Sequence, residues 1–153
     1  MKASRARHGE AGFTLIELLM VLAIIALAAA ISVPLMRRQS PGQELAAASI
    51  DLAAGLKLAR AAARTGNVEQ ALVVALDRRI YWSDGILPPR AFAPRLDVVL
   101  DVPESERPDS ATGRIRFFPD GTATPARLIL RAGKLETALA VEWLTGEIRT
   151  GAP

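Results

Sequence analysis

The sequence contains no cysteine and a single histidine among its 153 residues. Without thiols there is no disulfide framework, no thiolate zinc site and no cysteine nucleophile. The one histidine, His8, lies in a short basic stretch at the N-terminus, so the rest of the chain has no imidazole for acid–base catalysis or metal binding. We therefore expect no enzyme of the Ser-His-Asp class, no cofactor and no metal site.

Aromatic residues are also scarce, at 5%, although half of the residues are hydrophobic. This composition, rich in Ala, Leu, Ile and Val, is typical of long helices and small cores, and the length leaves room for one modest domain. The formal net charge is +3, but Lys2, Arg5 and Arg7 less Glu10 already give +2 before residue 13. The remainder is close to neutral, so the basic pI does not indicate a nucleic-acid partner.

A long apolar run follows the basic stretch. Residues 13–36 read FTLIELLMVLAIIALAAAISVPLM, and Glu17 is the only charged residue among them. A helix of this length crosses the ~30 Å hydrocarbon layer of a membrane. Because positive residues precede the run, the N-terminus is expected in the cytoplasm and the later chain outside it. The sequence therefore predicts a single-pass anchor with an extracytoplasmic head.

Two plainer interpretations of this run are open. Ala28-Ala29-Ala30 satisfies the small-x-small rule of signal peptidase, which would release a soluble protein, but the run exceeds the usual ~7–15 residue signal core and contains Glu17. An ordinary membrane anchor explains the hydrophobicity but not the carboxylate, which costs about 2.5–3.5 kcal/mol near the centre of a spanning helix. A residue of this kind usually has a partner.

The segment Gly12-Phe13-Thr14-Leu15-Ile16-Glu17-Leu18-Leu19 closely resembles the class III signal of type IV pilins and type II secretion pseudopilins. The resemblance implies cleavage between Gly12 and Phe13, N-methylation of Phe13, and a role for Glu17 in assembly. The freed amine of one subunit and the carboxylate of its neighbour are opposite charges at similar membrane depth. Since desolvation offsets their attraction, such a pair sets axial register more than it adds stability.

Pro34 adds to the resemblance, since the family often has a proline at this distance from the cut. Its missing N–H predicts a helix kink. The alternative is that Pro34 only marks the end of the span before Arg37 and Arg38.

A second helix is predicted from Gln43 to Thr65, with Pro41-Gly42 before it as either a break or a first turn, and Gly66-Asn67 as its stop. Arg60 and Arg64, one turn apart, are interpreted as a solvated helix face, and the alternative is a basic stripe that faces DNA. Apolar residues recur at helical spacing and predict the buried face: Leu45, Ala48, Leu52, Leu56, Ala59 and Ala63.

Strand-like runs replace the helical period after residue 67. Asp84-Gly85 and Pro88-Pro89 predict an irregular connection, and 103–112 a polar loop. The predicted strands are Val68–Asp77, Arg79–Ser83, Leu96–Val102, Arg114–Phe118, Leu128–Arg131, Thr137–Leu144 and Glu147–Thr150.

The order of elements predicts an α+β, pilin-like fold, in which a long N-terminal transmembrane helix packs its C-terminal half against an antiparallel β-sheet head. We divide the chain into a cleaved leader at 1–12, a transmembrane and assembly helix at 13–36, a periplasmic amphipathic continuation at 37–66, and the β head at 67–153.

Two segments of the C-terminal half, Ile115–Thr122 (IRFFPDGT) and Val141–Ile148 (VEWLTGEI), resemble the GspH-type minor pseudopilin, whose domain is shared with FimT- and FimU-like minor pilins. Asp120-Gly121 and Thr145-Gly146 are predicted turns, and Trp143 a core aromatic on a late strand. A calcium site like that of the major pseudopilin is not expected, because Glu147 is the only carboxylate from Thr145 to Pro153.

The resemblance implies a minor pseudopilin of a type II secretion system, a structural subunit at or near the tip of the periplasmic pseudopilus that helps to export folded proteins across the outer membrane. It implies a Gram-negative inner-membrane location, with the N-terminus cytoplasmic and the head periplasmic. The implied partners are a prepilin peptidase/N-methyltransferase, other major and minor pseudopilins, and the inner-membrane assembly platform.

Two other functions are open. A FimT/FimU-like minor pilin would serve pilus assembly or DNA uptake, and uptake requires the fold to gather arginines such as Arg78, Arg79, Arg90 and Arg95. A secreted or membrane-tethered binding module or enzyme would use residues 67–153, where no catalytic constellation supports it. No nucleic-acid partner is expected.

Overall fold

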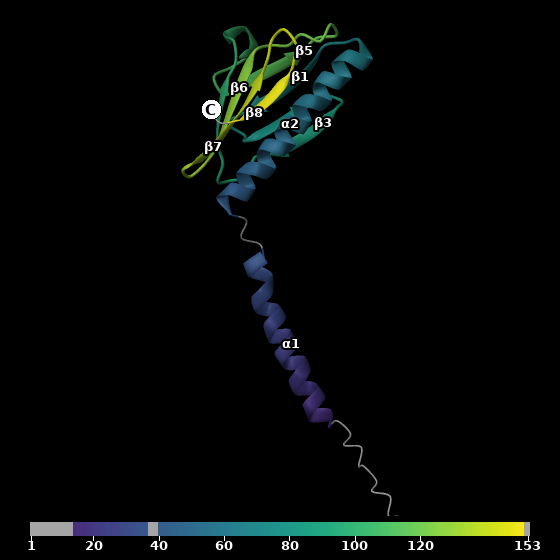
Figure 1. Ribbon diagram of the computed structural model, residues 1–153, viewed down its shortest axis with the longest axis vertical. Helices are drawn as coiled ribbons and strands as arrows, with labels where there is room; N and C mark the ends of the chain where they lie inside the picture. The colour runs from purple at the N-terminus through teal and green to yellow at the C-terminus, as the bar shows by residue number, and fades with distance from the viewer. Residues whose placement is uncertain (1–13, 37–39, 152–153) are drawn as a thin grey trace, which may run out of the picture. The chain divides into compact units, whose positions relative to one another are not determined.

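The computed structural model describes residues 14–36 and 40–151, with the backbone alone for 29–36. The chain divides into two units, Met1–Arg38 and Gln39–Pro153, and each is described by itself. The first contains helix α1 (Leu15–Met36), and the second contains helix α2 and all of the strands (Figure 1).

Helix α1 begins directly after Thr14. The Glu17 N–H donates to the Thr14 carbonyl at 3.0 Å and to its Oγ1 at 3.3 Å, so Thr14 caps the helix. From Leu15 to Leu27, the large apolar side chains are solvent-exposed in the single chain. Within the described residues, no helix meets the combined criteria of length and apolarity for a membrane span. α1 includes Pro34, whose predicted kink stays a prediction.

Helix α2 (Pro41–Gly66) begins with a complete capping box. The Ser40 hydroxyl accepts from the Gln43 N–H at 3.3 Å, and Gln43 Oε1 accepts from the Ser40 N–H at 3.1 Å. Pro41 occupies the first turn, where its missing N–H costs nothing. Asn67 ends the helix in a left-handed conformation, with φ of 49°. The predicted helix is confirmed, and Pro41-Gly42 forms its first turn.

The head contains two antiparallel four-stranded sheets, where a single sheet was predicted. The first has the order β3-β2-β1-β5 and the second the order β4-β6-β7-β8. A 3₁₀ turn, Glu104–Glu106, lies in the loop before β5. The strands are β1 (Gln70–Ala75), β2 (Ile80–Ser83), β3 (Leu87–Ala91), β4 (Asp97–Asp101), β5 (Thr112–Phe117), β6 (Ala126–Ala132), β7 (Leu135–Val141) and β8 (Ile148–Gly151).

One side of α2 forms the core with both sheets (Figure 1). The predicted positions Leu45, Leu52, Leu56, Ala59 and Ala63 are buried, Ala48 is half-buried, and Ser49 and Gly55 are buried as well. A Cβ on Gly55 would lie 3.1 Å from Leu87 Cδ2, so the glycine lets the helix approach β3 closely. The α+β, pilin-like class is confirmed.

The prediction of an irregular connection at Pro88-Pro89 is wrong, because both prolines lie within β3. β3 pairs only with β2 and forms the edge of its sheet, where a residue without an N–H is tolerated on the open side. Both side chains are exposed. The prolines therefore close this edge to further strand pairing.

Candidate functional site

The predicted processing residues Gly12 and Phe13 lie outside the described part of the chain, so the cut between them stays a prediction. Glu17 is described and lies in the first turn of α1 with its side chain exposed. The partial positive charge at a helix N-terminus favours a carboxylate there. The Glu17 N–H is bound by Thr14, and the Glu17 side chain is exposed, so its carboxylate is accessible to a partner.

The first C-terminal motif folds into a tight turn after β5. The Phe118 N–H donates to the Thr122 carbonyl at 3.0 Å. Asp120 Oδ1 accepts from the Thr122 hydroxyl at 2.7 Å and from its N–H at 2.9 Å, and these bonds hold the pKa of Asp120 below its usual value. Gly121 has φ of 93°, which L side chains rarely adopt.

The second motif forms the turn between β7 and β8. The Gly146 N–H donates to the Glu142 carbonyl at 2.8 Å, and the Glu142 N–H donates to the Glu147 carbonyl at 3.0 Å. Gly146 adopts φ of 60°. Both predicted turns are therefore present.

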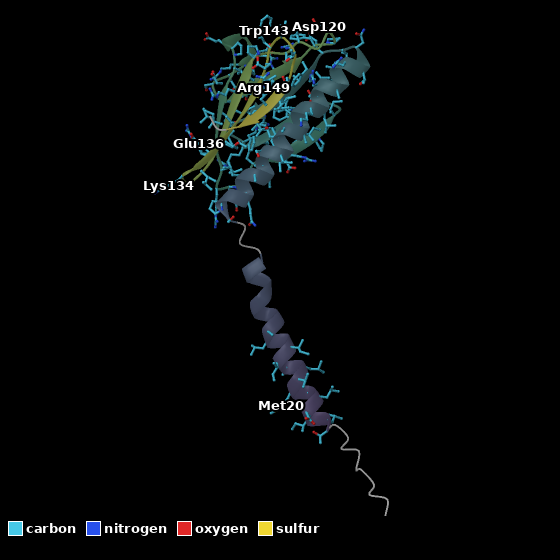
Figure 2. All side chains as sticks on the ribbon, viewed as in Figure 1. Met20, Asp120, Lys134, Glu136, Trp143 and Arg149 are labelled. Atoms are coloured by element: carbon cyan, nitrogen blue, oxygen red, sulfur yellow. The ribbon has the colours of Figure 1, made fainter. Side chains whose placement is uncertain are left out.

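The two turns contact each other and α2. The Ala123 N–H donates to the Trp143 carbonyl at 2.8 Å, and a Cβ on Gly146 would lie only 2.7 Å from the Gly121 carbonyl oxygen. From α2, Arg60 donates through Nη2 to the Thr145 carbonyl at 2.7 Å. We call this arrangement the turn junction. It ties the first sheet, the second sheet and α2 together, and Asp120 and Trp143 lie at the same end of the head (Figure 2).

The interpretation of Arg60 as part of a solvated helix face is wrong, because its side chain is half-buried at the turn junction. No local signal in the sequence identifies this role, since its partner is 85 residues away. Arg64, in contrast, is exposed.

Trp143 is not a core aromatic. Its side chain is 59% exposed, because β7 ends at Val141 and the tryptophan lies in the following turn next to exposed Leu144. Phe117, at the end of β5, occupies the interior instead. The turn therefore presents two large apolar side chains to solvent.

An ionic cluster, which the sequence did not reveal, lies where the loop before β5 packs on that strand. Arg116 donates to both carboxylate oxygens of Glu106 at 3.2 Å and to Glu69 at 3.0 Å, and these bonds raise the pKa of Arg116. Arg114 lies 3.5 Å from Glu106, whose side chain is 13% exposed. The cluster ties the 3₁₀ turn to β5.

Of the four arginines considered for DNA uptake, three contact different parts of the head, and Arg95 is exposed. Arg79 donates to the carbonyls of Ala93 and Leu96, and Arg78 lies over the Trp82 ring at 5.5 Å from its centroid. Burial raises the pKa of Tyr81, and the charge of nearby Arg90 opposes this rise. The described residues contain no group of three or more His, Cys, Asp or Glu side chains placed to hold a metal ion.

Two family models match this chain, one in its N-terminal segment and one in its head. The family model of the prokaryotic N-terminal methylation motif matches residues 7–33, and that of type II transport protein GspH matches residues 48–145. The chain belongs to the GspH family. Type II secretion system protein H of Xanthomonas campestris pv. campestris is 33% identical over 146 residues, with 92% of this chain and 82% of that protein covered.

Solved structures share the fold of this GspH-family chain. The minor pseudopilin EpsH from the type 2 secretion system of Vibrio cholerae aligns with a TM-score of 0.58 and 14% identity, over 72% of this chain and 98% of EpsH. The type IV minor pilin FimU of Pseudomonas aeruginosa aligns with a TM-score of 0.54 and 19% identity, over 71% of this chain and 88% of FimU. Of the turn junction, Arg60, Gly121, Trp143 and Thr145 lie within the residues that the GspH model matches, and Gly146 directly follows them.

Proposed function

We propose that the chain is a minor pseudopilin, a structural subunit of the pseudopilus of a type II protein secretion system. One observation carries the proposal: a methylation motif at 7–33 and a GspH domain at 48–145 occur in a single chain. The similarity to a curated secretion protein H supports the secretion system as the setting. We further propose that the subunit lies at or near the tip of the filament, where it helps to export folded proteins across the outer membrane.

The steps before assembly follow from the N-terminal segment. A prepilin peptidase/N-methyltransferase cuts between Gly12 and Phe13 and methylates the new terminus. Residues 13–36 then anchor the chain in the Gram-negative inner membrane, with the head in the periplasm. The assembly platform and the other pseudopilins are the partners that draw the subunit into the filament.

Glu17 is the assembly residue in this proposal. Its N–H is bound by Thr14, so the carboxylate is not needed to complete the helix cap. Its exposed position four residues after Phe13 supports a pairing with the methylated amine of an adjacent subunit. The pairing compensates both charges in a region where either one alone is costly.

Processing is tested by mass spectrometry of the mature protein from its native host. N-methylated Phe13 at the terminus supports the proposal, whereas a chain that begins at Ile31 indicates an ordinary signal peptide and overturns it.

The role of Glu17 is tested with Glu17→Ala, and Met20→Ala, another exposed position on α1, serves as the matched control. We expect both variants to be processed, but only Glu17→Ala to lose incorporation into sheared filaments. Normal incorporation of Glu17→Ala would remove the assigned role without affecting the family assignment.

The pilus function remains as a second candidate, because FimU shares the fold. A deletion strain separates the two. Loss of secreted proteins from the medium, restored by the wild-type gene, supports secretion, whereas intact secretion with a loss of surface pili supports the minor pilin.

A further inference from the structure

The two sheets of the head have four edge strands, and three of them, β3, β4 and β5, are closed to further pairing. On β3, Pro88 and Pro89 interrupt the row of N–H donors. On β4, the Arg107 side chain donates to the Leu100 carbonyl at 2.8 Å, so the loop after the strand covers its backbone. Proteins commonly block sheet edges in such ways, because unpaired N–H and C=O groups bind other extended chains.

β5 is closed at both of its ends by the adjoining loops. The Thr124 N–H donates to the Arg116 carbonyl at 2.8 Å, and the Arg116 N–H donates to the Thr124 hydroxyl at 3.4 Å. At the other end, Asp109 Oδ1 accepts from the Thr112 N–H at 2.7 Å. A further strand therefore cannot pair along β5 without displacing these loops.

β8, the fourth edge strand, is open on the side away from β7. Next to the turn that joins the two strands, the Glu142 N–H donates to the Glu147 carbonyl at 3.0 Å. Because bonded and non-bonded pairs alternate along antiparallel strands, Arg149 bonds to β7, whereas the N–H and C=O groups of Ile148 and Thr150 point away from it. No other residue that the structure describes hydrogen-bonds to these outward-pointing groups.

A groove runs between β8 and α2, which lie beside each other (Figure 1). Lys57, in this groove, is exposed and forms no ion pair with any residue that the structure describes. The groove therefore combines open backbone groups on β8, small apolar side chains on α2 and an unpaired positive charge. Its volume is about 330 Å³, and its lining consists of Thr150 and five residues of α2: Ser49, Ile50, Ala53, Ala54 and Lys57.

From the open edge we propose that β8 binds an extended segment of another protein, which adds a strand to the second sheet and places a carboxylate beside Lys57. A strand presents free N–H and C=O groups in the required row, whereas a helix bonds its own internally. Every second side chain of the added strand faces α2, so the segment has an apolar residue against Ala53 and Ala54 and an acidic one against Lys57. Because β8 has only four residues, the contact is short and weak.

The charges of β8 argue against a second copy of this chain as the occupant. In an antiparallel pair of two β8 strands, Ile148 of each copy lies opposite Thr150 of the other, and the two Arg149 side chains lie directly opposite each other. Like charges in this position are unfavourable. β8 also has no carboxylate to offer to Lys57. The pairing requires only the head, so it does not depend on the proposed function.

Amide hydrogen exchange of the full-length chain in detergent micelles tests the open edge. The probe is the synthetic peptide acetyl-TVTVTET-amide, whose residues favour an extended chain and whose valines and glutamate share one face. Without peptide, the amides of Ile148 and Thr150 are expected to exchange at least about tenfold faster than that of Arg149, which bonds to β7. Saturating peptide is expected to slow exchange at Ile148 and Thr150 by about tenfold or more and to leave Arg149 unchanged.

Two changes to the backbone test whether the peptide pairs as a strand. Thr150→Pro removes an outward N–H without breaking a bond to β7 and is expected to weaken binding by about tenfold or more, whereas Thr150→Val keeps the edge and is expected to bind as the wild type does. The same peptide N-methylated at every residue is expected to give no protection. If the unmodified peptide fails to protect Ile148 and Thr150, or the N-methylated peptide protects them equally, the proposal is overturned.

Charge reversal tests the carboxylate. Lys57→Glu is expected to weaken binding of the peptide by about threefold or more, and replacing the peptide's glutamate with lysine is expected to restore it. Lys134→Glu, in the exposed hairpin between β6 and β7, is the matched control and is expected to change nothing (Figure 2). Equal effects of the two reversals would remove the carboxylate from the proposal. Protection of Ile148 and Thr150 that rises with protein concentration in the absence of peptide would show that a second copy occupies the edge, and would overturn the assignment to another protein.

Discussion

Gly146→Ala tests whether the two C-terminal turns contact each other as the structure has them. At this position a methyl group meets two obstacles. The backbone has φ of 60°, which costs an L residue roughly 1–2 kcal/mol. The new Cβ would also lie 2.7 Å from the Gly121 carbonyl oxygen and 3.1 Å from Arg60 Nε.

The chain offers a control that separates the two costs. Gly133, in the turn between β6 and β7, has φ of 65°, and a Cβ there would have nothing within 4 Å. Gly133→Ala therefore measures the backbone cost alone. Displacing a backbone carbonyl and a bound arginine adds an overpacking cost of about 1–3 kcal/mol at Gly146. We expect a total loss of about 2–5 kcal/mol for Gly146→Ala, against about 1–2 kcal/mol for Gly133→Ala.

The measurement is urea unfolding of residues 39–153, the unit that contains the whole core, with both variants compared with the wild type. If the dependence of the unfolding free energy on urea concentration is the same in all three proteins, the shifts in the urea midpoint give the two losses of free energy. Equal losses at the two glycines would refute the close contact between Gly146 and Gly121, and with it the turn junction.

Three further predictions concern the head, and each is measured by its stability to urea or heat. Trp143→Ala is expected to cost less than about 1 kcal/mol because the side chain is exposed, whereas Phe117→Ala in the core is expected to cost about 3–5 kcal/mol. Glu106→Gln is expected to cost about 1–2 kcal/mol because two arginines converge on a mostly buried carboxylate, against at most about 0.5 kcal/mol for Glu136→Gln at an exposed pair. Folding lowers the pKa of Asp120, because its carboxylate accepts hydrogen bonds from Thr122. Asp120 therefore stabilises the folded head above the unfolded pKa of about 4, and this stabilisation is lost as the pH falls through the lower pKa of the folded state. Asp120→Asn should make the free energy of unfolding depend less on pH in this acid range.

Local patterns predicted the elements of the fold well. α2 shows both a 3.6-residue period and a terminating Gly66-Asn67, so its extent and buried face could be predicted from neighbouring residues alone. The two C-terminal turns were predicted for a similar reason, because Asp120-Gly121 and Thr145-Gly146 supply the positive φ that such turns require.

Long-range arrangement could not be predicted in the same way. The division into two sheets depends on which strands pair, and β1 pairs with β5 across 36 or more residues of intervening chain. Arg60 was missed because its acceptor is a distant backbone carbonyl, which no side-chain pattern reveals. Trp143 was misplaced because β7 ends at Val141, three residues before the end of the predicted strand at Leu144. Pro88 and Pro89 were misplaced because a proline pair indicates a loop except at the open edge of a sheet.

The two C-terminal motifs contain both glycines that contact each other in the interior of the turn junction and side chains, Trp143 and Leu144, that are exposed. Gly146 lies against the backbone of Gly121, and a Cβ at Gly146 would lie only 2.7 Å from the Gly121 carbonyl oxygen. Any side chain at Gly146 therefore requires the two turns to move apart. Trp143 and Leu144 are exposed, and substitutions there change the folding free energy little. The stability of the head therefore depends on the turns, whereas Trp143 and Leu144 are open to contact with other molecules. It follows that substitutions at Trp143 and Leu144 can change what the head contacts without changing the turn junction.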